Sequence, residues 1–327
     1  MPALIRLGII GERHSPISSV ALERALALSD VRVEWFVEAD PAPEVWESVN
    51  GRMFDAGPVA SLARRALTRA RRASLDCARL CERARIAYHR PTAQSINRGL
   101  PAEMYDASGA DFVLVAGCDQ LLDDAGRRLA RERMVNFHYS LLPAYRGKYS
   151  LFWQWYLREP EPGISFHEVD AGIDSGPPVY QAALEYRVGE SYPELFGRAV
   201  SACGDHLPGL ISCLRDERRV VMDPPRQPSY FPAREYLRLV TPAPDRTVEE
   251  VLGVFHRTGY LRLANGLVVR HLVASGQGQR DGRIEIGTEG ITLPLADGWI
   301  TVSIDRRVPF ALARLLVGRA RLLATLE

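Results

Sequence analysis

The stretch that decides the fold is residues 111–138, DFVLVAGCDQLLDDAGRRLARERMVNFH. An apolar Phe-Val-Leu-Val run lies within 111–116, helical spacing follows at 121–130, and a second candidate strand, Met-Val-Asn-Phe-His, lies at 134–138. A short run that is apolar at every position predicts a strand buried on both faces. A strand, a helix and a second strand in this order predict a parallel βαβ unit.

The same alternation continues on both sides of this stretch. It predicts the α/β class, with a doubly wound, Rossmann-like and mostly parallel sheet. Such sheets bind ligands at the carboxyl ends of their strands, which here are 116–117 and 136–138. The other expected strands are 4–10, 32–37, 85–88, 164–170 and 178–186, and the other expected helices are 18–29, 96–108 and 190–216.

The chain has 327 residues, more than one ordinary domain holds, so we expect two domains. We predict a main domain over 1–222, a proline-rich linker without regular helix over 223–245, and a small β-rich, OB-like domain over 246–327. Asp297-Gly298 is a hairpin signal in the small domain. Its expected elements are a helix at 248–256, strands at 267–273, 283–286, 291–294 and 299–304, and a final helix at 310–326.

Composition narrows the classes of partner. The chain has 41 basic and 40 acidic residues, a net charge of +1, so no overall field favours nucleic acid or a membrane. The arginine-rich segment 59–83 is interpreted as a packed helix with a solvated face, and the alternative is a nucleic-acid surface. No apolar run reaches the roughly 20 residues of a membrane span. Five cysteines and no signal-like start favour a reduced, cytoplasmic location, and a homodimer is left open.

Two motifs gather the chemically active side chains, NFHYSLLPAYRG at 136–147 and HEVDAGIDSG at 167–176. Asn136 and His138 are two residues apart at a strand end, so their side chains share one face. Asp174 follows on a glycine-rich loop. An amide and an imidazolium stabilise a developing oxyanion, and a carboxylate raises the imidazole pKa and accepts a proton through water. This set suits acyl transfer without a covalent intermediate.

Two other interpretations of these residues are open. Each of the three is also compatible with a purely structural role at a strand end. A serine hydrolase would use Ser140 with His138 and Asp174. The chain has no Gly-x-Ser-x-Gly elbow, and Ser140 lies beside the histidine on one short segment, which disfavours the hydrolase.

The pattern Asn-x-His-x-Ser-Leu-Leu-Pro-x-Tyr-Arg-Gly, followed by His-x-Val-Asp-x-Gly-Ile-Asp-x-Gly, closely resembles the formyltetrahydrofolate-dependent formyltransferase family. That family includes glycinamide ribonucleotide, methionyl-tRNA and amino-sugar formyltransferases. The resemblance is strong over about 110–185 and weaker from about 85. Beyond about 235 it is only architectural.

The resemblance implies that Asn136, His138 and Asp174 are catalytic, that N10-formyltetrahydrofolate donates the formyl group, and that no metal takes part. Asn136 and His138 would hold the oxyanion, while Asp174 would orient His138 and help remove the proton. His167 either supports the site or is a buried structural residue. By the same resemblance, the pterin would contact Gly117, Cys118, Asp119, Gln120, Leu121, Leu122, Val169 and Asp170, mostly through backbone groups.

We expect the amine substrate to meet the residues after His138. Tyr139 stands where the family usually has a small residue or proline; it narrows the amine pocket, stacks on a substrate or packs beneath the loop. Arg146 and Lys148 either meet a phosphate or are solvated loop charges. The predicted substrate-binding residues are Tyr139, Ser140, Tyr145, Arg146 and Lys148.

The residues after Gly147 bear on the identity of the amine. Methionyl-tRNA formyltransferases usually continue with Ala-Ala-Pro-Ile-Gln, whereas this chain has Lys148-Tyr149-Ser150. We therefore expect N-formylation of a small-molecule primary amine, first a nucleotide-linked amino sugar. The alternatives are an amino-acid-derived amine or hydroxylamine of siderophore or natural-product biosynthesis, methionyl-tRNA, hydrolysis of formyltetrahydrofolate, and a folate-binding module without activity.

Overall fold

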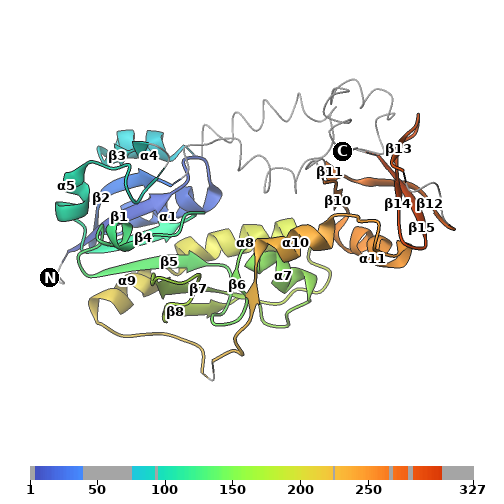
Figure 1. Ribbon diagram of the computed structural model, residues 1–327. Helices are drawn as coiled ribbons and strands as arrows, with labels where there is room; N and C mark the ends of the chain where they lie inside the picture. Colours follow the sequence, from blue (N-terminus) through green and yellow to red (C-terminus); the bar gives the residue numbers. More distant parts are fainter. Residues whose placement is uncertain are drawn as a thin grey trace. The chain divides into compact units, whose positions relative to one another are not determined.

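The computed structural model describes residues 4–39, 76–92, 95–223, 225–264, 268–278 and 283–303. These residues belong to two compact units, the first ending at Phe231 and the second beginning at Pro232 (Figure 1). The helix predicted at 310–326 and most of the arginine-rich segment, 59–75, lie outside the described residues.

A seven-stranded sheet forms the centre of the first unit. In sheet order its strands are β3 (Ala87–His89), β2 (Val31–Glu38), β1 (Ile5–Gly11), β4 (Phe112–Ala116), β5 (Arg133–His138), β7 (Gly163–Glu168) and β8 (Pro178–Ala183). The first five are parallel, and β7 pairs antiparallel with both of its neighbours. The chain order reverses between β1 and β4, which is where open α/β sheets bind ligands.

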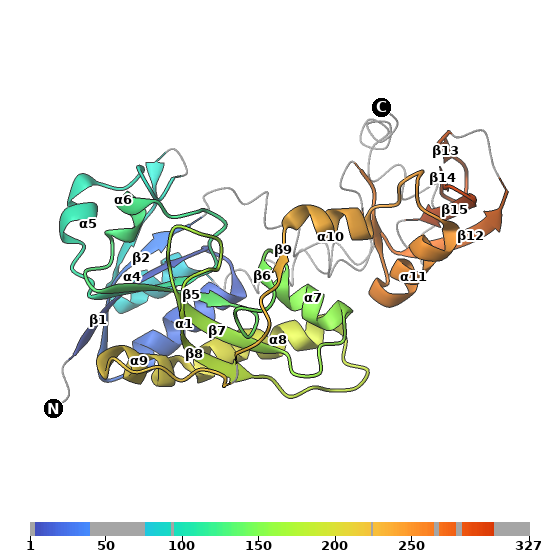
Figure 2. The ribbon, with the colours of Figure 1, turned by 60° about the horizontal axis from the view of Figure 1, so that its bottom comes forward.

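Alternate side chains of β4 enter two separate layers of apolar core. Phe112 and Leu114 belong to one layer, and Val113 and Val115 belong to the other. Every β4 residue is at most 5% exposed, because helices cover both faces of the sheet. The doubly wound α/β prediction is confirmed. Figure 2 shows three helices on one face of the sheet: α1 (Pro16–Ala27), α8 (Tyr192–Asp205) and α9 (Leu207–Arg215). The same face is also covered by α4 (Cys77–Ala84). The other face is covered by α5 (Ala102–Ala107) and α6 (Asp124–Arg127).

Two predicted helices are much shorter than expected. The helix predicted at 96–108 is reduced to α5, because Pro101 occupies the N-cap and a proline does not fit a helix interior. The helix predicted at 121–130 is reduced to α6. It begins where the Asp123 carboxylate accepts two backbone N–H groups of the first turn.

The single helix predicted at 190–216 is divided into α8 and α9 at His206. Pro208 lies in the first turn of α9, and it lacks the N–H that an unbroken helix would donate. The predicted strands of this unit are all present, with boundaries moved by a few residues.

The segment between β5 and β7 carries two short elements, β6 (Arg146–Gly147) and α7 (Ser150–Tyr156). β6 pairs in parallel with β9 (Tyr230–Phe231), the last element of the first unit. The end of this unit therefore lies against the loop that holds the end of the motif at 136–147.

The second unit is β-rich, as predicted. Its four-stranded antiparallel sheet has the order β12-β15-β14-β13, and β14 and β15 flank the predicted Asp297-Gly298 turn. Val251 of α11 packs with Ile291 and Ile300 of the sheet in one core. The elements are α10 (Ala233–Val240), α11 (Val248–Thr258), β10 (Leu261–Arg262), β11 (Val268–Val269), β12 (His271–Gln277), β13 (Glu285–Ile286), β14 (Ile291–Pro294) and β15 (Gly298–Ser303).

The expectation that 223–245 contains no regular helix is wrong, because α10 lies within it. Pro232 precedes α10 as its N-cap and Pro242 follows its end, so neither proline interrupts its hydrogen bonds. The Tyr236 and Tyr260 hydroxyls are 3.0 Å apart and link α10 to the rest of the second unit. The OB-like arrangement and the domain limits stay predictions.

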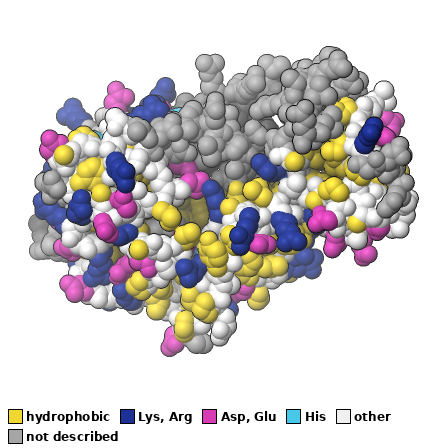
Figure 3. All heavy atoms as spheres, in the orientation of Figure 1, with side chains coloured by type: hydrophobic (Ala, Val, Ile, Leu, Met, Phe, Trp, Pro, Cys, Tyr) yellow, Lys and Arg dark blue, Asp and Glu magenta, His cyan; other side chains and the backbone are white. Residues whose placement is uncertain are grey.

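The surface of the described residues matches the balanced charge of the chain. On the face seen in Figure 3, basic and acidic side chains are interspersed. No helix among the described residues is long and apolar enough to cross a membrane. Within the same residues, no cluster of three or more His, Cys, Asp and Glu side chains is arranged to hold a metal ion.

Candidate active site

His138 ends β5 and is 6% exposed. Its Nε2 lies 2.9 Å from the carbonyl oxygen of Tyr145, and because a carbonyl only accepts, Nε2 carries the hydrogen. Its Nδ1 lies 3.6 Å from Oδ1 of Asp174. Burial lowers the pKa of His138, and the Asp174 carboxylate opposes this by raising it. An acceptor therefore lies beside each ring nitrogen of His138, a carbonyl oxygen at Nε2 and a carboxylate at Nδ1.

Asp174 reaches both histidines of the site from the loop between β7 and β8. Its Oδ1 lies 3.6 Å from His138 Nδ1 and 3.5 Å from His167 Nε2, and its Oδ2 accepts the Gly147 N–H at 2.9 Å. Burial pushes the pKa of Asp174 upward, but the two imidazoles and the Gly147 N–H hold it at about 2. The carboxylate is thus ionised at neutral pH.

His167 fixes the side chain of Asn136. The two residues are cross-strand neighbours on β5 and β7, and Asn136 Nδ2 lies 3.1 Å from His167 Nε2. His167 Nδ1 lies 2.9 Å from the Glu168 carbonyl oxygen, so Nδ1 carries the hydrogen and Nε2 accepts from the amide. His167 is both buried and in contact with the site, so the two roles expected for it coincide.

The structure thus brings together the three side chains expected to be catalytic. They supply an amide donor, an imidazole whose pKa is lowered by burial, and an ionised carboxylate. Ser140 does not join them: it is fully buried, and its hydroxyl donates to the Ala144 carbonyl oxygen at 2.7 Å. The serine-hydrolase alternative therefore has no available nucleophile in Ser140, and a contact of Ser140 with substrate is also corrected.

Tyr139 does not face the site. Its ring packs edge-on to Phe137 at 4.9 Å and stacks on Phe196 of α8 at 5.9 Å, within the apolar core. The reason is the two-residue period of a strand, which places Phe137 and Tyr139 opposite Asn136 and His138. The predicted contact of Tyr139 with an amine is corrected to the packing alternative.

The remaining predicted substrate residues are engaged with the protein itself. Tyr145 contributes its carbonyl to His138, while its hydroxyl donates to Glu159 at 2.8 Å. Arg146 Nε and Nη2 donate to the Ile173 carbonyl at 3.0 and 2.7 Å, which holds the loop of Asp174.

Lys148 pairs with a residue of the predicted pterin loop. Its Nζ lies 2.8 Å from Oδ2 of Asp119, so the lysine is neutralised by a residue of the loop after β4. The Lys148 side chain is 42% exposed, so it is a solvated loop charge that also forms an ion pair between two loops, and its contact with a phosphate stays a prediction.

The loop predicted to contact the pterin follows β4 at the switch point of the sheet. Gly117 has a φ of +93°, which favours glycine, and Cys118 is half-buried. The Gln120 amide is used internally, because Oε1 accepts the Ile96 N–H and Nε2 donates to the Ala39 carbonyl. The Leu121 side chain is exposed, whereas Leu122 is buried in the core.

The second predicted pterin segment, at 169–170, is ordered by local bonds. Val169 donates its N–H to the Met134 carbonyl oxygen at 2.9 Å. Oδ1 of Asp170 accepts from the Gly172 N–H at 2.9 Å and from the Ser175 hydroxyl at 2.7 Å. Asp170 therefore shapes the loop that delivers Asp174.

Comparison with known proteins places this site in a family. Residues 65–206 match the family model described as formyl transferase, and this range contains Asn136, His138 and Asp174. The chain carries a formyl transferase domain. Formyl transferases are enzymes that move formyl groups. The match confirms the family that the two motifs predict.

The relatives of the formyl transferase domain have several acceptors in their names. GDP-perosamine N-formyltransferase of Brucella melitensis is 36% identical over 91 residues, 28% of this chain and 35% of that protein. Methionyl-tRNA formyltransferase of Sorangium cellulosum is 39% identical over 70 residues, 21% of this chain and 22% of that protein. The chain thus spans about a third or less of the length of these curated relatives.

The fold extends further than the sequence similarity. An N-formyltransferase from Helicobacter canadensis, solved with folinic acid and dTDP-3-aminofucose, aligns with 91% of this chain and 98% of its own. The TM-score is 0.53 at 14% identity. The sugar 3N-formyltransferase WlaRD aligns with 91% of this chain and 97% of its own, with a TM-score of 0.51 and 14% identity. At this identity the likeness shows the fold alone.

Arg127 of the formyl transferase domain is a residue that the sequence analysis missed. Its Nη1 donates to the carbonyls of Leu122 at 2.6 Å and Asp170 at 3.4 Å. It therefore ties together the two loops predicted to hold the pterin. An arginine in the last turn of a short helix carries no sequence signal for such a role.

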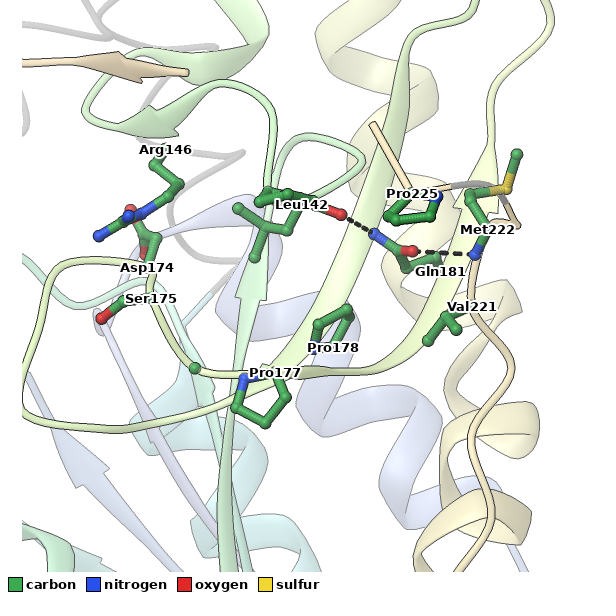
Figure 4. A pocket seen from close by; sticks show the side chains of 12 residues that line it. Leu142, Arg146, Asp174, Ser175, Pro177, Pro178, Gln181, Val221, Met222 and Pro225 are labelled. Atoms are coloured by element: carbon green, nitrogen blue, oxygen red, sulfur yellow. Dashed lines mark hydrogen bonds between the residues drawn. The ribbon is translucent and has the colours of Figure 1, made fainter. Parts of the chain in front are cut away.

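A small cavity of about 190 Å³ adjoins Asp174 in the formyl transferase domain (Figure 4). Arg146 and Asp174 lie together at one end of the view, and Gln181 and Met222 lie at the other, joined by a hydrogen bond from the Met222 N–H. The cavity is smaller than the roughly 300–1,000 Å³ of ordinary ligand pockets. It is therefore too small to hold a folate and an amine together.

Proposed function

We propose that this chain is an N-formyltransferase that moves the formyl group of N10-formyltetrahydrofolate to a primary amine of a nucleotide-linked amino sugar. The observation that carries the proposal is the convergence of Asn136, His138 and Asp174 at one end of β5, inside a formyl transferase domain. The pterin is assigned to the loops at 117–122 and 169–174, which Arg127 ties together.

The residues of the site divide the chemistry between them. When the amine attacks the formyl carbon, Asn136 donates to the oxygen that becomes negative, since one amide hydrogen is used by His167 and the other is available. His138 takes up the proton that the amine loses, and its new N–H then faces the Asp174 carboxylate. N10-formyltetrahydrofolate would supply the formyl group. The bond from the formyl carbon to N10 would break, and N10 would receive the proton that His138 took from the amine, which restores His138.

The class of amine rests on the loop after Gly147 and on one relative. The sequence Lys148-Tyr149-Ser150 lacks the Ala-Ala-Pro-Ile-Gln usual in methionyl-tRNA enzymes. GDP-perosamine N-formyltransferase, whose name specifies a nucleotide-linked amino sugar, is 36% identical over its matched part. The net charge of +1 also supports a small acceptor, because a tRNA-binding surface usually carries a basic excess.

Methionyl-tRNA is the second candidate acceptor. The observation in its favour is the methionyl-tRNA formyltransferase that is 39% identical over 70 residues. The two candidates differ in the size of the acceptor, so one assay separates them.

The experiment is a formyl-transfer assay with N10-formyltetrahydrofolate and separate amines: GDP- and dTDP-linked 3- and 4-amino sugars, ornithine, N-hydroxyornithine and charged initiator tRNA. Tetrahydrofolate release and the mass of the acceptor are measured together. We expect release that depends on an amino sugar, with a formyl mass gain on that sugar. Transfer to tRNA or ornithine instead would refute the sugar assignment, and release without any amine would indicate a hydrolase.

Variants of the site provide the control. Asn136→Ala and His138→Ala should each lower kcat/KM by about a hundredfold or more, because each removes a group that acts on the reacting atoms. Circular dichroism establishes that the variants are folded. Near-normal turnover in either variant would remove that residue from the mechanism.

A further inference from the structure

The last segment of the first unit, residues 219–231, runs back across the loop that carries the site. Val220 pairs with Tyr180 of β8, and its carbonyl accepts the Gln181 N–H at 2.7 Å. The segment ends as β9, which pairs with β6. It lies beyond residues 65–206, so the family match does not include it.

Ser229 makes three hydrogen bonds to the loop between His138 and α7. Its N–H donates to the Pro143 carbonyl at 3.2 Å, and its carbonyl accepts the Arg146 N–H at 2.9 Å. Its hydroxyl accepts the Tyr145 N–H at 2.8 Å. One residue thus holds three positions of this loop.

The same loop contacts the two proton-handling residues on its other side. The Tyr145 carbonyl accepts from His138 Nε2, and the Gly147 N–H donates to Asp174 Oδ2, both at 2.9 Å. Tyr145 therefore connects Ser229 to His138, because its N–H bonds to Ser229 and its carbonyl oxygen bonds to His138. Gly147, which pairs with Phe231 of β9, likewise connects β9 to Asp174.

The backbone of this loop needs such external support. Tyr145 has a φ of +58° and Gly147 a φ of +96°, and this region costs a non-glycine residue about 1 kcal/mol. Phe231 of β9 stacks on Tyr145 at 5.4 Å and on Trp153 at 4.8 Å, which clamps the loop from the same side as Ser229.

We propose that Ser229 is a positioning residue for the reaction: through Tyr145 and Arg146 it sets the carbonyl that orients His138 and the N–H that orients Asp174. This inference rests on the proposed function, because it assigns the purpose of the arrangement to formyl transfer. Ser229 itself touches neither reacting group.

The test compares Ser229→Ala with Ser229→Thr. Alanine removes the acceptor of the Tyr145 N–H, while threonine keeps it, and Ser229 is only partly buried, so a methyl group has room. The matched control is Ser212→Ala on α9, which removes a hydroxyl that bonds Asp216 on the protein surface.

We expect Ser229→Ala to lower kcat about tenfold with both KM values within twofold of wild type, since misplacement affects the reaction more than binding. Ser229→Thr should recover kcat to within about threefold of wild type, and Ser212→Ala should leave it unchanged. Three results would overturn the proposal: a change in KM alone, an unchanged kcat in Ser229→Ala, or an equal fall of kcat in both Ser229 variants.

A second readout does not depend on turnover. In 15N-labelled protein, the His138 Nε2–H should exchange with water at least about tenfold faster in Ser229→Ala than in wild type, and at the wild-type rate in Ser229→Thr. Unchanged exchange in Ser229→Ala would refute the link between Ser229 and His138. If wild type formylates none of the amines but the exchange differs as expected, the proposed function fails while the positioning contact stands.

Discussion

Replacing Asp174 with asparagine tests the electrostatics of the site most directly. The two imidazoles and the Gly147 N–H hold the pKa of Asp174 at about 2, against an ordinary value of 3.8. A tenfold change in proton affinity is worth about 1.4 kcal/mol, so the ionised carboxylate stabilises the folded state by about 2 kcal/mol. The side chain is 14% exposed, so solvent screens this little.

The sign of the pH dependence follows from the lowered pKa. The stabilisation is fully present above about pH 4, where the carboxylate is ionised in both the folded and the unfolded chain. It is lost as the pH falls from about 4 to 2, because the unfolded chain binds the proton first. The asparagine of Asp174→Asn does not titrate, so the free energy of unfolding of this variant should not show this part of the fall in acid.

The assay is urea unfolding, followed by near-ultraviolet circular dichroism, at pH values from 7 to 2.5. We expect the free energy of unfolding of wild type to fall by about 1–2 kcal/mol more than that of Asp174→Asn over the acid range. The matched control is Asp245→Asn, which makes the same substitution at an exposed position outside the site. Equal acid losses in wild type and Asp174→Asn would refute the low pKa of Asp174.

Three other predictions follow from particular contacts. Tyr139→Phe should leave kcat and KM unchanged, and Tyr139→Ala should lower the free energy of unfolding by about 3 kcal/mol in urea, because the ring packs in the core; a selective change in amine KM would contradict this. Lys148→Met and Asp119→Asn should each change that free energy by less than about 1 kcal/mol, because both side chains are nearly half exposed; a loss above about 3 kcal/mol would be incompatible with a surface pair. Cys118 is half-buried and should react with iodoacetamide before the four buried cysteines, because burial raises the pKa of their thiols. If the loop binds a folate, folinic acid should slow the labelling of Cys118, and mass spectrometry measures both the order and the protection.

Much of the first unit was predictable, because its signals are local. The continuous apolar run of β4 marks burial on both faces, and the alternation of strands with helices implies a parallel sheet. The two-residue period at the end of β5 places Asn136 beside His138. The same period places Tyr139 on the opposite face, so the sequence already favoured its packing alternative over a contact with substrate.

The errors in the helices also have local causes that the helical spacing hid. Pro101 and Pro208 shorten or break helices whose apolar spacing continues past them. In 223–245 the mistake was the reverse, since Pro232 and Pro242 bound a helix instead of interrupting it.

The sequence by itself determined the fold class, the family and the three side chains of the candidate site, because these depend on hydrophobic period and on motifs of adjacent residues. The tertiary structure alone decided what holds those side chains in place. Arg127 and Ser229 act through backbone carbonyl and N–H groups, most of them of residues distant in the chain. Every residue type except proline carries both groups, so such contacts leave no mark on the sequence, and only the folded chain shows which of them meet.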